Sequence, residues 1–164
     1  YRFCNTGLLM PKMRGFTLIE LIIVLILVGI LAAVALPRFA DLGRDSRISA
    51  LQGLAASLKS SASIAHSLQL TRRLGTNVSV PLEGQTATMR NGYPTANAAG
   101  IGRAANQQGF TQTGGGGGAN SITNFAISGF TVNAGLQCRV RYQAANPAVA
   151  ARRVPVITLQ TTGC

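Results

Sequence analysis

The stretch that decides the fold lies near the start of the chain and reads Gly15-Phe16-Thr17-Leu18-Ile19-Glu20, followed by the uncharged apolar run Leu21–Leu36. Glu20 is the only charged residue in residues 15–37. As a helix, Phe16–Leu36 would be about 31 Å long, which is roughly the thickness of the hydrocarbon core of a bilayer. A carboxylate in such a segment raises the free energy of insertion, so Glu20 is a candidate functional residue that needs a partner.

Residues 1–15 form a separate, basic segment. The apolar run after it is longer than that of a secretory signal peptide, and no small-x-small cleavage site ends it. The small residue Gly15 precedes the run, so cleavage there would keep the apolar segment in the product. We expect residues 1–9 to be upstream sequence, with Met10 or Met13 as the natural start.

This pattern resembles the class III signal of type IV pilins and pseudopilins: a basic leader, a small residue, an aromatic residue, Thr-Leu-Ile-Glu and an apolar helix that reaches Pro37. In that family a membrane aspartyl peptidase cuts after the glycine and methylates the new N-terminus. The resemblance therefore implies cleavage of the Gly15–Phe16 bond and N-methylation of Phe16. The alternative is an ordinary membrane anchor in which Glu20 has no special role.

The family role of the acidic residue also makes physical sense. After cleavage, the amine of Phe16 is a cation and Glu20 is an anion, and neither is stable alone in an apolar environment. Each can neutralise the other within one subunit or between neighbouring subunits of a filament, where the pair also sets the register. We therefore expect Glu20 to be needed for assembly rather than for insertion.

Gly29 and Pro37 are expected to shape this helix. Pro37 has no N–H to donate, and its ring clashes with the carbonyl of Ala33, so we expect a bend there. Gly29 weakens the helix by about 1 kcal/mol relative to alanine. Because related pilins loosen between two such sites in filaments, we expect the same of Gly29–Pro37, with a continuous helix as the alternative in an isolated subunit.

The segment beyond Pro37 predicts an amphipathic helix that ends near Leu74 and Gly75. Its apolar positions recur every three or four residues and mark one face: Ile48, Leu51, Ala55, Leu58, Ala62 and Ala65, broadened by Leu54, Ile64 and Leu68. We expect this face to pack on a small sheet formed by the rest of the chain.

Four segments after the helix predict strands: Thr76–Pro81, Asn124–Val132, Cys138–Tyr142 and Val154–Leu159. Short connections without crossover helices favour an antiparallel sheet, and Asn146-Pro147 predicts the turn between the last two strands. The predicted fold is α+β. A long N-terminal helix, with its apolar half protruding and its amphipathic half on the sheet, is followed by a C-terminal disulfide loop. We divide the chain into a leader (1–15), a transmembrane and filament-core helix (16–36), and an amphipathic helix with a globular head (37–164).

Two further stretches predict loops. The run Gly114–Gly118 predicts a flexible surface loop, because it lacks the Lys-Ser/Thr and βαβ context of a phosphate-binding loop. Asn91-Gly92-Tyr93-Pro94 is a turn signal and also resembles a motif of the mannose-sensitive haemagglutinin (MSHA) branch of type IVa pilins. The segments Pro37–Phe39 and Ser46–Gly53 are similar to the same branch.

Loss of the leader would leave two cysteines, Cys138 and Cys164. An even pair in an exported domain suggests a disulfide, and the two positions match the ends of the surface loop that pilins close in this way. Free thiols or a metal site are the alternatives, although two cysteines without nearby histidines make a poor zinc site.

The chain is strongly basic, with a net charge of +11 and no acidic residue after Glu83. We expect a basic surface formed by Arg139, Arg141, Arg152 and Arg153. Repeated along a filament, such a surface would attract anionic surfaces or DNA. The alternative is a solvated face with no partner.

Other function classes find little support in the sequence. His66, the only histidine, falls within the amphipathic helix, and no pair of carboxylates is placed for acid–base chemistry, so we expect no enzyme and no cofactor. A calcium-binding pseudopilin of type II secretion needs several carboxylate oxygens, and Glu83 is the only acid near the predicted sheet. A minor pilin, a DNA-binding pilin and a singly anchored periplasmic binding domain stay open.

The resemblance as a whole implies a major pilin of the type IVa family, most like its MSHA branch. Its partners would be other copies of itself, a prepilin peptidase, and an assembly platform with its ATPase. It would lie in the inner membrane of a Gram-negative bacterium before it enters an extracellular adhesive filament.

Overall fold

The computed structural model describes residues 15–164, apart from the side chains of Ala40 and Asp41. The predictions about the leader, including its alternative start residues, lie outside the described residues. The chain divides into two units, Tyr1–Asp41 and Leu42–Cys164. The predicted boundaries at residues 15 and 36 stay predictions.

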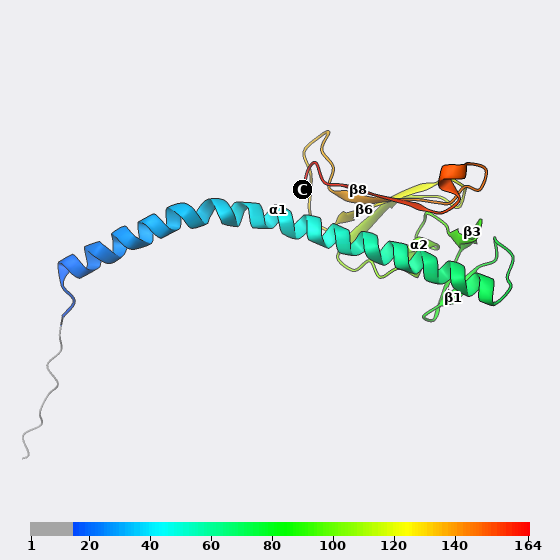
Figure 1. Ribbon diagram of the computed structural model, residues 1–164, viewed down its shortest axis with the longest axis horizontal. Helices are drawn as coiled ribbons and strands as arrows, with labels where there is room; N and C mark the ends of the chain where they lie inside the picture. Colours follow the sequence, from blue (N-terminus) through cyan, green and yellow to red (C-terminus); the bar gives the residue numbers. More distant parts are fainter. Residues whose placement is uncertain (1–14) are drawn as a thin grey trace, which may run out of the picture. The chain divides into compact units, whose positions relative to one another are not determined.

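Helix α1 runs from Leu18 to Thr71 (Figure 1). Among the described residues it is the one helix that is long and apolar enough to cross a membrane, with a mean hydropathy of 3.1 in its most apolar stretch. The helix is unbroken at Gly29 and contains Pro37. The bend and the loosening of Gly29–Pro37 therefore stay predictions for the packed filament.

The helix ends a few residues earlier than predicted, because the backbone of Arg73 takes the left-handed conformation (φ +52°). Leu74 N–H donates to the Gln69 carbonyl oxygen (3.0 Å) and Arg73 N–H to that of Leu70 (3.0 Å). These two bonds form a Schellman motif, which satisfies carbonyls that the end of a helix leaves free. The prediction of a stop at Gly75 was wrong, since an arginine rather than a glycine takes the left-handed position.

The predicted apolar face of α1 is the face that packs in the second unit. Leu51 and Leu58 are fully buried, as is Ala65, whereas Ile64 is 58 % exposed, so its assignment to this face was wrong. The main core joins the helix to the sheet, and its largest members are Leu51, Leu54, Leu58, Ile101, Phe125, Val140 and Tyr142.

One antiparallel sheet of four strands, in the order β5-β6-β7-β8, packs along this part of α1 (Figure 1). The strands are β5 (Phe110–Gly114), β6 (Ile122–Ile127), β7 (Arg139–Gln143) and β8 (Val156–Gln160). The antiparallel sheet and the three C-terminal strands were predicted, within a few residues at the ends. Strand β6 stops before Gly129, whose φ of +75° is incompatible with a regular strand.

Two small hairpins and the short helix α2 connect α1 to this sheet, and a second short helix, η1, lies between β7 and β8. The predicted strand Thr76–Pro81 was largely wrong, because the side chain of Gln69 donates to the carbonyl oxygens of Gly75 and Val78 (2.9 Å each) and holds that segment as a turn. The elements are β1 (Val80–Leu82), β2 (Gln85–Ala87), β3 (Met89–Arg90), β4 (Tyr93–Pro94), α2 (Ile101–Ala104) and, later in the chain, η1 (Ala150–Arg152).

The turn predicted at Asn91-Gly92 joins β3 to β4, with both residues at positive φ (+54° and +85°).

The glycine run is more ordered than predicted. Gly114 ends β5, and Gly116 N–H donates to the Ala96 carbonyl oxygen (2.8 Å) in an isolated bridge.

Candidate functional site

The first candidate site is the start of α1, where Thr17 and Glu20 cap the helix reciprocally. The Thr17 N–H and Oγ1 donate to Glu20 Oε2 (3.3 and 3.0 Å), and the Glu20 N–H donates to Thr17 Oγ1 (3.3 Å). This is a capping box, and the Thr-x-x-Glu spacing could have revealed it in the sequence. Sequence reasoning assigned a role to Glu20 but missed Thr17.

The capping box has a chemical consequence for an acid in an apolar segment. Two donors from Thr17 and the partial positive charge at the helix N-terminus partly compensate the Glu20 carboxylate. Glu20 follows Phe16 by four residues in the sequence, and Phe16 is 73 % exposed. The site can therefore hold an anion at the helix start.

The second candidate site is the disulfide loop. Cys138 and Cys164 form the predicted disulfide, with their Cα atoms 4.8 Å apart, so the alternatives of free thiols or a metal site are wrong for this pair. Sequence reasoning missed Arg47 of α1, whose Nε donates to the Cys164 carbonyl oxygen (2.7 Å). The Arg47 guanidinium also lies over the Phe130 ring, 4.5 Å from its centroid. These contacts fasten the end of the loop to α1.

The third candidate site is the predicted basic surface, of which the structure brings two residues together. Arg139 and Arg141 alternate along β7 with Val140 and Tyr142, which are fully buried, so both arginines lie on the outer face of the sheet. Arg139 is held by two neutral side chains, with Nε donating to Gln160 Oε1 (2.7 Å) and Nη2 to Gln137 Oε1 (2.8 Å).

The other two predicted members lie apart in sequence, around η1. Arg152 ends η1 and its Nη1 donates to Asn120 Oδ1 (3.3 Å), whereas Arg153 follows as the exposed C-cap of η1. No contact between them and the arginines of β7 is described, so the common surface of all four stays a prediction.

Two titratable side chains of the second unit have structural contacts. His66 stacks on Tyr93, with ring centroids 4.3 Å apart, and its Nδ1 lies 2.7 Å from the Gly92 carbonyl oxygen. Burial raises the pKa of Tyr142, with a smaller contribution from Tyr93, and its hydroxyl donates to the Pro94 carbonyl oxygen (2.8 Å). Both side chains fix the β3–β4 hairpin to the core.

Among the residues that the structure describes, no group of three or more His, Cys, Asp or Glu side chains could hold a metal ion. The described sites are therefore a capped carboxylate, a disulfide loop and a basic sheet face.

Residues 10–36 match the family model described as "Prokaryotic N-terminal methylation motif". The chain carries a prokaryotic N-terminal methylation motif. It is 44 % identical over 54 residues to the type IV narrow pilus major component PilA5 of Thermus thermophilus, a match that covers 33 % of this chain and 47 % of the relative. It is 48 % identical over 54 residues to the fimbrial protein of Moraxella nonliquefaciens, covering 33 % of this chain and 35 % of the relative.

The chain therefore aligns with less than half the length of these two relatives. No solved structure matches it. The motif includes the capped carboxylate and the apolar start of α1, which is long enough to span a bilayer.

Proposed function

We propose that this chain is a major pilin, the structural and non-enzymatic subunit of a type IV pilus that adheres to surfaces. One observation carries the proposal: the methylation motif at residues 10–36 runs into an apolar helix with a single carboxylate at its start. The relative from Thermus thermophilus is named as the major component of a narrow pilus, which supports the same role here.

The proposed pathway uses residues already described. A prepilin peptidase cuts the Gly15–Phe16 bond in the inner membrane and methylates the Phe16 amine. The new amine then neutralises Glu20, either in its own subunit or in a neighbour, while an assembly platform and its ATPase extract the subunit. The Phe16–Leu36 helices, whose side chains are exposed in the single chain, become the apolar core of the filament.

Electron microscopy of producing cells, together with the mass of the sheared product, tests this function. We expect filaments built mostly of this chain, with N-methylated phenylalanine as the first residue and an intact Cys138–Cys164 disulfide. Recovery of the chain only from the membrane, with its leader attached, would point instead to a singly anchored periplasmic domain.

Filament composition separates the major pilin from its close alternatives. A minor pilin or a pseudopilin would form a small part of the shaft or a short periplasmic fibre. Within the family we propose the MSHA branch of the type IVa group and a Gram-negative host, on the resemblance of Asn91–Pro94 and Ser46–Gly53. Loss of the filament when the other proteins of an MSHA-type assembly system are removed would support that branch.

A second candidate function, binding of duplex DNA or another anionic polymer, is favoured by the outer face of the sheet. Next to Arg139 and Arg141, this face presents neutral hydrogen-bonding side chains, namely Thr111, Thr113, Asn124, Gln143, Thr158 and Gln160. Arginine, threonine and amide side chains are the groups that contact phosphates without reading bases.

Co-sedimentation of filaments with duplex DNA at several salt concentrations tests this second function. Arg141→Gln should weaken retention and lower the salt slope by about 1, whereas Arg44→Gln, on α1, should not. Wild-type filaments that retain no DNA at low salt would exclude it.

A further inference from the structure

The β1–β2 hairpin places one unusual residue at its tip. Leu82 pairs with Gln85, so the connection is the two-residue turn Glu83-Gly84, with φ values of +44° and +80°. Such turns strongly favour asparagine, aspartate or glycine at the first position, and a glutamate there is strained. Local preference therefore does not explain Glu83, and an outlier of this kind suggests a function.

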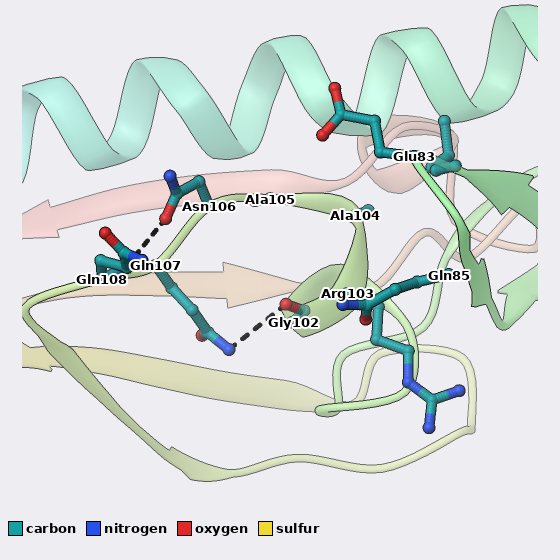
Figure 2. Close-up of a pocket in the computed structure, with 10 residues that line it drawn as sticks. Glu83, Gln85, Gly102, Arg103, Ala104, Ala105, Asn106, Gln107 and Gln108 are labelled. Atoms are coloured by element: carbon teal, nitrogen blue, oxygen red, sulfur yellow. Dashed lines mark hydrogen bonds between the residues drawn. The ribbon is translucent and has the colours of Figure 1, made fainter.

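Glu83 is also the only acidic residue after Asp45 in a chain with 15 basic and four acidic side chains. It is exposed, and no ion pair of Glu83 is described with any residue whose side chain the structure describes. Arg103, which lines the same cavity as Glu83, donates through Nη1 to the Thr86 carbonyl oxygen (3.1 Å). Figure 2 shows the Arg103 guanidinium on the far side from the Glu83 carboxylate.

Glu83 borders an open cavity of about 420 Å³, which we call the acceptor cavity. The cavity is also lined by three residues with amide side chains, Asn106, Gln107 and Gln108, of which Gln107 extends toward Gly102 in Figure 2. The Gln107 Nε2 donates to the Gly102 carbonyl oxygen (3.3 Å), and this bond fixes the orientation of the Gln107 amide group. The Gln107 Oε1 is buried and has no hydrogen-bond partner among the described residues.

These features describe a site for a cationic group with several N–H donors. Glu83 and neutral amide side chains line the same cavity together with Arg103, whose guanidinium lies on the far side from the Glu83 carboxylate. The carboxylate is therefore free to accept hydrogen bonds from an incoming donor, with amide groups beside it. A guanidinium carries five N–H donors and cannot lose its charge, so it fits better than an ammonium or a neutral group.

The proposed filament supplies such a group at high concentration. After loss of the leader the chain has 11 arginines and one lysine, and every copy repels its neighbours. We infer that the acceptor cavity receives an arginine side chain from a second copy of the chain, with Glu83 as its counter-charge. The inference rests on the proposed function, because the polymer brings the second copy to the cavity. The arginines with exposed side chains and no described side-chain hydrogen bond include Arg72, Arg73 and Arg153, which are the first partners to test.

The decisive variant is Glu83→Asn, measured as filament yield from producing cells and as thermal unfolding of the full-length chain in detergent. Because asparagine suits the turn, the unfolding midpoint should stay equal or rise, while the filament yield should fall about tenfold, as for loss of a close charge pair at an interface. Asp45→Asn, on α1, is the matched control and should lose much less.

Charge reversal identifies the partner. Glu83→Arg alone should reduce the filament yield at least as much as Glu83→Asn. Combining Glu83→Arg with one of three reversals, Arg72→Glu, Arg73→Glu or Arg153→Glu, should restore the yield. Wild-type yield from Glu83→Asn, equal losses from Asp45→Asn, or failure of all three combinations would overturn the inference. Absence of filaments from the wild-type chain would instead overturn the proposed function.

Discussion

At the scale of the residue, Glu20 combines two interactions that a single substitution can separate. Its carboxylate accepts hydrogen bonds from Thr17 in the capping box, and in the proposed filament it also neutralises the Phe16 amine. Glutamine fulfils the first role, since capping boxes use Glu or Gln, but not the second.

We therefore predict that Glu20→Gln inserts in the membrane and starts its helix normally, yet assembles as poorly as Glu20→Ala or Glu20→Val. Removing one partner of a buried ion pair costs about 3–5 kcal/mol, enough to abolish most filaments. The measurement compares sheared filament with precursor retained in membranes. Normal filaments from Glu20→Gln would assign the residue to helix capping alone.

Tyr142 gives a prediction about pH at the same scale. Burial raises its pKa in the folded chain above the ordinary value of 10.0 that applies when the chain is unfolded. The folded state thus binds this proton more tightly, and stability should fall as the pH rises above about 10.

Tyr142→Phe should remove this contribution to the alkaline loss of stability and, at neutral pH, cost about 1 kcal/mol, because the Pro94 carbonyl oxygen loses its donor. Thermal unfolding of the chain at pH 7 and above pH 10 measures both effects. An unchanged stability at neutral pH would show that the hydroxyl bond contributes nothing.

At the scale of the element, the glycines of the run differ in how much space surrounds them. Gly115 has a φ of +115°, and a side chain there would meet the Ala96 carbonyl oxygen across the isolated bridge. Gly117 has open space around it. The same residue type is thus needed at one position and free at the other.

We expect Gly115→Ala to destabilise the chain by about 1–3 kcal/mol, from the disallowed backbone conformation and the contact with Ala96. Gly117→Ala is the matched control and should change stability by less than about 0.5 kcal/mol. Chemical unfolding of the two variants measures the difference. Equal tolerance of both changes would mean that the whole run is flexible.

At the scale of the whole molecule, the disulfide joins Cys164, after β8, to Cys138, just before β7. The bond from Arg47 to the Cys164 carbonyl oxygen links the same end of the chain to α1. The disulfide closes a loop with a sequence separation of 26 residues. The loop-entropy model gives about 3.5 kcal/mol for a loop of this size.

We predict that the double variant Cys138→Ser, Cys164→Ser unfolds with about this loss of stability, and that reductant produces a similar shift in the parent chain. The double change is preferred because it leaves no unpaired thiol. An unfolding midpoint that is insensitive to reductant would show that Arg47 and the sheet hold the loop without help.

The sequence was sufficient for features that depend on local or periodic patterns. The apolar helix with its acid, the buried face at Leu51 and Leu58, the alternation of β7 and the Asn91-Gly92 turn all follow from spacing and backbone preference, and the structure has them. The two cysteines could be paired because the predicted loss of the leader left one possible partner for each.

Other features depended on particular hydrogen bonds, local or long-range, that a sequence pattern does not reveal. Gln69 turns a β-branched segment away from the sheet, Arg73 ends the helix where a glycine was expected, and Arg47 meets a residue 117 positions later. The acceptor cavity around Glu83 likewise forms only when the β1–β2 hairpin lies against α2. Sequence alone thus determined what each segment prefers, and the tertiary structure decided which preferences prevailed, because packing and long-range hydrogen bonds outweigh local propensity.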